Sequence, residues 1–141
     1  MILPDVNVLV SAARDDAQRH VECRRLLIDS LAARRPVALP DFVVSGFLRV
    51  ITHPRIFTPP TAIADALEFI ASLRANASVV LLQPGPAHWD IFAGLCRAVE
   101  ARGNLIPDAY LAALAIEQGA ELVSADRDFT RFPGLRWRHP S

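Results

Sequence analysis

Short apolar runs alternate along the chain with longer segments in which apolar residues recur every three or four positions. The short runs have the pattern of buried β-strands: residues 1–4, 37–39, 79–82 and 121–123. The longer segments have the periodicity of amphipathic helices: residues 18–35, 41–51, 62–73, 86–99 and 108–116. Strands that alternate with helices predict a layered α/β fold with a mostly parallel sheet, in a single domain over residues 1–141.

Individual residues set the expected helix boundaries. We expect Asp41 to cap the helix that follows it, and the Pro59-Pro60 pair to begin the next one. Pro86 is expected to open a helix that carries Trp89 on its apolar stripe. The alanine-rich helix after residue 108 should end at Gly119, since glycine is the usual residue after a helix C-terminus.

The composition of the chain excludes several classes of protein. The chain has 52% hydrophobic residues and 21% charged residues, which excludes a disordered protein. All 15 basic residues are arginine, so a P-loop nucleotide site, a Schiff-base enzyme and a phosphoacceptor receiver domain are excluded. The formal net charge of zero argues against a protein that binds nucleic acid through overall charge alone.

The sequence also indicates a compartment. Cys23 and Cys96 form no short-spacing motif and fall on inward-facing helix positions, as expected of buried thiols in a reducing environment. No apolar stretch approaches the ~20 residues that a membrane span needs. The first residues lack the basic leader of a signal peptide. We therefore expect a cytoplasmic protein without a membrane partner.

Four aspartates are candidates for chemistry. Asp5 ends the first strand, Asp126 and Asp128 follow the last strand, and Asp108 lies in the first turn of a helix. Ligands of open parallel sheets bind beyond the carboxyl ends of the strands, where these acids would meet. Carboxylates without cysteine or histidine partners suit a hard cation, Mg²⁺ or Mn²⁺. The four histidines lie at no metal-ligand spacing and are expected at the surface or at caps.

The residues alone leave a second interpretation open. Asp108 could be a favourable first-turn acid, and Asp126 and Asp128 could be ordinary turn residues. Asp5 is harder to explain in this way, because an ionisable group in an apolar strand segment needs a partner or a metal. A small α/β binding module with incidental acids is therefore the alternative to a metal site.

Four segments then appear in a fixed order: DVN at 5–7, FLRVITHPRIF at 47–57, GNLIPDAYLAALA at 103–115 and LVSADRDFTRFPG at 122–134. Together they resemble a PIN domain, specifically a VapC-type ribonuclease toxin of a bacterial toxin–antitoxin pair. The resemblance implies a three-layer α/β/α fold with helices on both faces of a parallel sheet. It also implies Mg²⁺-dependent endonucleolytic cleavage of RNA.

The resemblance assigns roles residue by residue. Asp5, Asp108 and Asp126 match the catalytic metal ligands. The residues that match supporting positions, through hydrogen bonds or water, are Asn7, Ser124 and Asp128. The implied partners are a small VapB-type antitoxin that obstructs the acidic groove, an RNA substrate and a second copy of the toxin. The apolar helices at 42–51 and 62–73 could form the dimer face or belong to the core.

One departure from the family pattern matters. Many PIN nucleases carry a glutamate just before the Phe-Leu-Arg stretch, where this chain has Gly46. No glutamate lies between Glu22 and Glu68, and Asp41 is the only nearby acid. Losing one carboxylate favours an alternative: a degenerate PIN-like domain that binds RNA or antitoxin without cleaving RNA.

Overall fold

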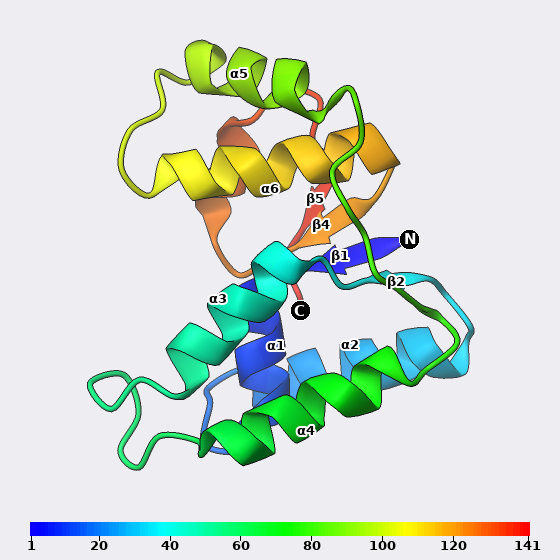
Figure 1. Ribbon diagram of the computed structural model, residues 1–141, viewed down its shortest axis with the longest axis vertical. Helices are drawn as coiled ribbons and strands as arrows, with labels where there is room; N and C mark the ends of the chain where they lie inside the picture. The colour runs from blue at the N-terminus through cyan, green and yellow to red at the C-terminus, as the bar shows by residue number, and fades with distance from the viewer.

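Five short parallel strands form the central layer of the computed structural model, which describes residues 1–141 (Figure 1). The strands lie in the order β3-β2-β1-β4-β5. Their bounds are Ile2–Pro4 for β1, Val37–Ala38 for β2, Val79–Val80 for β3, Glu121–Val123 for β4 and Trp137–Arg138 for β5. Every neighbouring pair is parallel, so the sheet is parallel throughout rather than mostly so.

Helices cover both faces of the sheet, which confirms the three-layer α/β/α expectation. Figure 1 shows α5 and α6 on one side and α1 to α4 on the other. The helices are α1 (Val6–Ala13), α2 (His20–Ala32), α3 (Asp41–Ile51), α4 (Ile63–Arg74), α5 (His88–Ala98) and α6 (Leu105–Gln118), with a 3₁₀ helix, η1, at Arg127–Arg131. None of these helices combines the length and the apolar character needed to cross a membrane.

The alanines of α6 set the position of that helix on the sheet. Four of them are fully buried: Ala109, Ala112, Ala113 and Ala115. Their small side chains allow close approach to the strands, as the alanine-rich pattern indicated. The helix ends at Gly119, whose φ of 68° is left-handed, also as expected. It begins at Leu105, which leaves Asp108 in the first turn.

Three boundary predictions were wrong. Helix α5 begins at His88 rather than at Pro86. Asp41 is the first residue of α3 rather than its cap, and its carboxylate accepts a hydrogen bond from Gln83 Nε2 at 3.3 Å. The next helix, α4, begins at Ile63 and not at the Pro59-Pro60 pair, because Arg14 holds that segment as a connection.

The stripe predicted for α5 was also partly wrong. Trp89 is 69% exposed, whereas His88, predicted to lie at the surface, is buried. The helix turns His88 and Leu95 inward, and the ring of His88 contacts the Tyr110 carbonyl through Nε2 at 3.0 Å. Apolar spacing identified the helix but not which of its faces would be covered.

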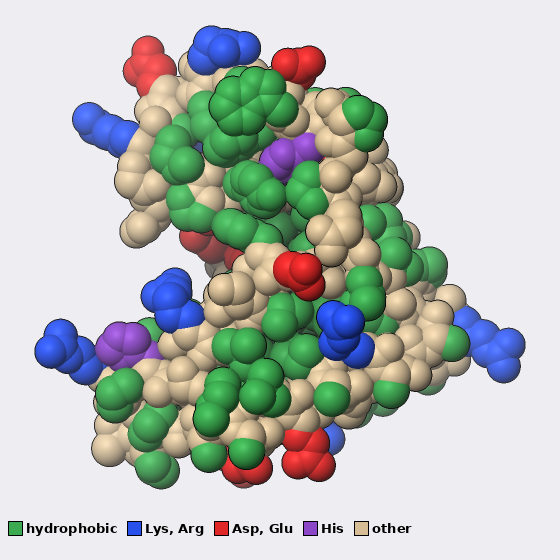
Figure 2. Space-filling view, viewed as in Figure 1, with side chains coloured by type: hydrophobic (Ala, Val, Ile, Leu, Met, Phe, Trp, Pro, Cys, Tyr) green, Lys and Arg blue, Asp and Glu red, His purple; other side chains and the backbone are tan.

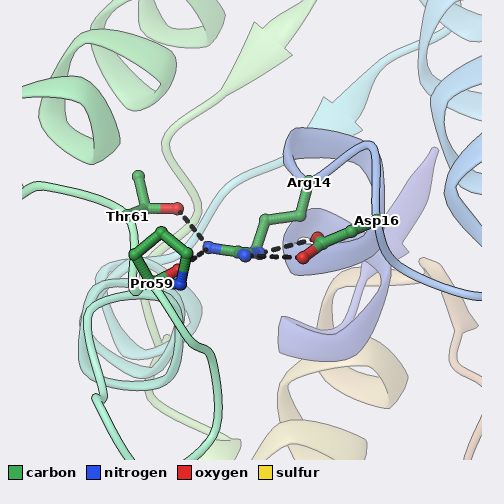
Figure 3. Close-up of polar contacts among 4 residues, drawn as sticks. All are labelled: Arg14, Asp16, Pro59 and Thr61. Carbon is green, nitrogen blue, oxygen red and sulfur yellow. Dashed lines mark hydrogen bonds and ion pairs between the residues drawn. The ribbon is translucent and has the colours of Figure 1, made fainter.

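Arg14 fixes the connection between α3 and α4 to the end of α1 (Figure 3). Its Nε and Nη2 atoms donate to the two carboxylate oxygens of Asp16 at 2.9 and 2.7 Å. Its Nη1 atom donates to the Pro59 carbonyl at 3.0 Å and to Thr61 Oγ1 at 3.1 Å. The guanidinium also lies 4.1 Å from the centroid of the Phe57 ring. One side chain therefore joins two distant segments.

We predict that Arg14→Lys lowers the free energy of unfolding by about 1–3 kcal/mol, because a lysine cannot reproduce the fork of bonds to Asp16 and the 59–61 segment. Urea unfolding measures the change. The control is Arg19→Lys, whose ion pair with Glu22 is long, at 3.6 Å, and exposed. It should change stability by less than about 0.5 kcal/mol. Equal effects at both positions would contradict the role given to Arg14.

Candidate metal centre

The carboxyl ends of β1 and β4 bring distant residues together. The two strands pair in parallel with Pro4 opposite Val123, so Asp5 and Ser124 follow at the same edge of the sheet. The backbone N–H of Asp5 donates to the Val123 carbonyl at 2.9 Å, which extends the ladder past the last strand residue. The site therefore forms where the sequence predicts it, beyond the strand ends.

The carboxylate of Asp5 is held by three donors. Its Oδ1 atom accepts from the Val6 backbone N–H at 2.7 Å, which also caps α1. Its Oδ2 atom accepts from Ser124 Oγ at 2.8 Å and from Asn7 Nδ2 at 3.1 Å. Asn7 is fixed in turn, because its Oδ1 atom accepts from the Ala125 N–H at 3.1 Å. The orientation of Asp5 is thus set before any ligand binds.

Ser124 is fully buried and connects the two strand ends. Its hydroxyl donates its proton to Asp5 and accepts from Asn7 Nδ2 and from the Asp126 N–H, both at 3.0 Å. Its carbonyl accepts from the Trp137 indole at 3.2 Å. Asn7 and Ser124 therefore lie in direct contact with the acids they were predicted to support.

Three other carboxylates form a group of which Asp5 is not a member. One oxygen from each of Asp108, Asp126 and Asp128 lies within 4.8 Å of the others. Asp126 also caps η1 by accepting from the Asp128 N–H at 2.9 Å, so the two acids follow a turn rather than sharing the face of an extended strand. Asp126 is therefore a turn residue and also a member of this acidic group. Asp128 lies inside this acidic group rather than behind it.

Asp5, Asp108 and Asp126 line one groove of about 570 Å³. Figure 2 shows it as a notch between α3 and the layer of α5 and α6, with acidic atoms at its base. The first turn of α6 supplies Asp108 to one wall, and α3 forms the opposite wall. The groove is open to solvent, so an extended substrate can reach the acids.

Burial and neighbouring negative charge raise the pKa values of Asp108 and Asp5. Burial raises the pKa of Asp108 to about 7, and the negative charges of Asp126, Asp5 and Asp128 contribute further. Burial also raises the pKa of Asp5 above its usual value, although the hydrogen bonds from Ser124 and Val6 oppose this. A cluster of oxygen donors with excess negative charge matches the preference of a hard divalent cation, so the residues present fit such an ion.

From the sequence, Gly46 was connected with the site as the position of the glutamate in many PIN nucleases, but the helix face around it was not identified as a wall. Phe42, Ser45, Gly46 and Arg49 all line the groove. Their spacing, i, i+3, i+4 and i+7, places them on one helix face, and that spacing was the available signal. The apolar residues of the same segment predicted only a stripe that faces the core or forms a dimer, and not a helix face that lines a groove.

Gly46 occupies this wall because Val6 leaves no room for a side chain. A Cβ atom at position 46 would lie 2.7 Å from Val6 Cγ2. A glutamate could therefore enter here only if Val6 moved. Asp41 does not replace the missing carboxylate, since it does not line the groove and bonds to Gln83 instead.

Comparison with known proteins identifies one family. The family model described as PIN domain matches residues 2–135. Ribonuclease VapC43 of Mycobacterium tuberculosis is 47% identical over 140 residues, which cover 99% of this chain and 95% of the relative. Among solved structures, VapBC2 from Rickettsia felis, bound to a promoter DNA fragment, aligns with a TM-score of 0.72 at 17% identity and covers 99% of this chain and 98% of its own. The sarcin-ricin loop cleaving toxin VapC20 of M. tuberculosis aligns with a TM-score of 0.65 at 18% identity, over 96% of this chain and 99% of its own.

The raised pKa of Asp108 predicts a pH-dependent effect of Asp108→Asn on metal-free protein. Folded Asp108 keeps its proton up to about pH 7, whereas the unfolded chain releases it near 3.8. Stability of the natural protein is therefore lost as pH rises through this window. Compared with it, the variant should gain stability between about pH 4 and about pH 8 in EDTA, as measured by urea unfolding. Asp41→Asn, at an acid outside the group, is the control, and a gain that does not change with pH would contradict the assignment.

A double-mutant cycle tests the contact between Gly46 and Val6. Alanine is favoured over glycine in a helix by about 1 kcal/mol. Gly46→Ala should nevertheless lower the free energy of unfolding by about 1–3 kcal/mol, because Val6 must move. In a Val6→Ala background the same change should be stabilising. If Gly46→Ala stabilises both backgrounds, Val6 does not restrict this position.

Proposed function

The chain belongs to the PIN-domain family, and from that membership we propose that it is a VapC-type endoribonuclease, the toxin of a VapBC pair. One observation carries the proposal: the ends of β1 and β4 and the first turn of α6 bring Asp5, Asp126 and Asp108 into one open groove. The ribonuclease names of relatives that match nearly the whole chain support it.

Asp5, Asp108 and Asp126 are the proposed ligands of a divalent cation, with Mg²⁺ the first choice and Mn²⁺ an alternative. Asp128 lies in the same acidic group and is placed to assist, directly or through water. When bound, such a cation stabilises charge on the phosphoryl oxygens and lowers the pKa of a water molecule. The elevated pKa values of Asp108 and Asp5 support this assignment, because a cation stabilises the charged carboxylates that burial, and to a smaller extent mutual repulsion, destabilise.

The nucleophile we propose is water. The hydroxyl of Ser124 already donates to Asp5 and accepts two further hydrogen bonds, so it is not free to attack a phosphate. Its contribution, with Asn7, is to hold the Asp5 carboxylate in one orientation. Attack by water from outside the ribose leaves a 5′-phosphate and a 3′-hydroxyl on the products.

The proposed protein partner is a VapB-type antitoxin. The structural neighbour from R. felis is a VapBC complex, and its aligned chain covers 99% of this chain. A small antitoxin that inserts a cationic side chain among the acids would obstruct the groove. We also propose that the toxin forms a homodimer.

The net charge of zero does not prevent RNA binding, because a bound cation would offset much of the acidic charge in the groove.

We expect Asp5→Asn and Asp108→Asn each to reduce divalent-dependent RNA cleavage by at least about 100-fold, since outer-shell partners alone are worth 10- to 100-fold. Cleavage of structured RNA, with EDTA as a control and analysis of the product ends, measures this. Asp41→Asn is the matched control, because Asp41 is exposed and outside the acidic group.

Two results would contradict the proposal. Full activity in both site variants would remove the aspartates from the mechanism. Absence of cleavage by the natural chain with either Mg²⁺ or Mn²⁺, together with RNA or antitoxin binding, would instead favour the degenerate PIN-like domain that Gly46 suggests.

A further inference from the structure

The groove-facing side of α3 combines an aromatic ring, a glycine and a cation. Phe42 lies near its N-terminal end and is 40% exposed, although it is a large apolar residue. Gly46 provides no side chain in the middle. Arg49, at the far end, is exposed. Phe42 and Arg49 are seven residues apart, so about 10 Å of helix separates them.

The ring of Phe42 is supported from behind. It packs against Tyr110 with 4.7 Å between ring centroids and an interplanar angle of 35°. Tyr110 is itself held edge-on by His88 at 4.4 Å and by Phe92 at 5.5 Å. A ring braced on one side in this way is a rigid surface, and its exposed part belongs to the lining of the groove.

Arg49 is an unpaired cation in an acidic groove. It forms no ion pair and no hydrogen bond with any residue of the chain, although Asp5, Asp108 and Asp126 line the same groove. The charge of the guanidinium is therefore available to an anion from outside. A cationic peptide segment would be repelled at this end, whereas a phosphate would be attracted.

We propose that this face of α3 binds single-stranded RNA across the cleavage site. Phe42 stacks on an unpaired base on one side of the acidic cluster, and Arg49 contacts a backbone phosphate on the other. Bases offer their faces to aromatic side chains only when they are unstacked, so the stacking contact with Phe42 requires an unpaired nucleotide at this point. Between the two contacts the wall is formed by the Gly46 backbone and the Val6 side chain, which fills the space that a side chain at position 46 would take. This inference rests on the proposed ribonuclease function and names two residues that contact its substrate.

The test of stacking uses a single-stranded RNA pool of about 12 nucleotides. Binding is measured by fluorescence anisotropy in an Asp108→Asn background, which prevents cleavage. Phe42→Leu should weaken affinity by about 5- to 100-fold, as expected for the loss of one stacked base, while Phe42→Trp should retain it. Trp89→Leu, at an aromatic outside the groove that is 69% exposed, should have no effect. The affinity for the corresponding duplex should not change in any variant.

The test of Arg49 is the salt dependence of the same binding. Arg49→Gln should reduce the slope of log K against log salt by about 0.7, the value for one phosphate contact on a single strand. Arg49→Lys should restore the slope. Arg25→Gln, on the remote helix α2, is the control and should leave it unchanged.

The outcomes separate this inference from the proposed function. If the natural chain cleaves RNA and the Phe42→Leu and Arg49→Gln variants bind single strands as tightly as the parent, the inference is overturned and the nuclease remains. If Phe42→Leu instead weakens only the cognate antitoxin, the ring is a protein contact and the inference also fails. If the chain binds single strands through Phe42 and Arg49 but never cleaves, the inference holds and the nuclease proposal fails.

Discussion

The hydrogen bond from the Ser124 hydroxyl to the Asp5 carboxylate is the interaction on which the groove depends. It joins the ends of two strands that are 119 residues apart in sequence, at 2.8 Å. Because Ser124 is fully buried, its hydroxyl must be satisfied within the protein, and Asp5, Asn7 and the Asp126 amide satisfy it. The position of Asp5 and the start of the turn that carries Asp126 are therefore fixed by one side chain.

The same arrangement concentrates negative charge that the metal-free fold does not neutralise. Helix α6, whose alanines are buried in the core, carries Asp108 close enough to Asp126, Asp5 and Asp128 for their charges to raise its pKa. Core packing elsewhere in the domain thus maintains a repulsive cluster at its edge. An acidic cluster of this kind favours a cation and lowers the stability of the metal-free protein. Such a trade-off between stability and function is common at functional sites.

Much of the framework could be predicted from the sequence because it depends on local patterns. Strand runs that end at Asp5 and just before Asp126, and the alanines that follow Asp108, were sufficient to place the acids at one edge of a parallel sheet. The α3 wall could not be predicted in the same way. Periodicity shows that Phe42 and Arg49 share a helix face, but it does not show whether that face meets the core or a groove. The exposure of Trp89 and the burial of His88 escaped prediction for the same reason.

The contact between position 46 and Val6 has an evolutionary consequence. A lineage that carries valine at position 6 cannot regain a side chain at position 46 by a single substitution without displacing that valine. The order of changes is constrained, with a smaller residue at position 6 needed first. Val6 also supplies the backbone N–H that donates to the Asp5 carboxylate, so that first step would occur directly beside the proposed metal ligand. Introducing a side chain at position 46 thus requires two compatible changes.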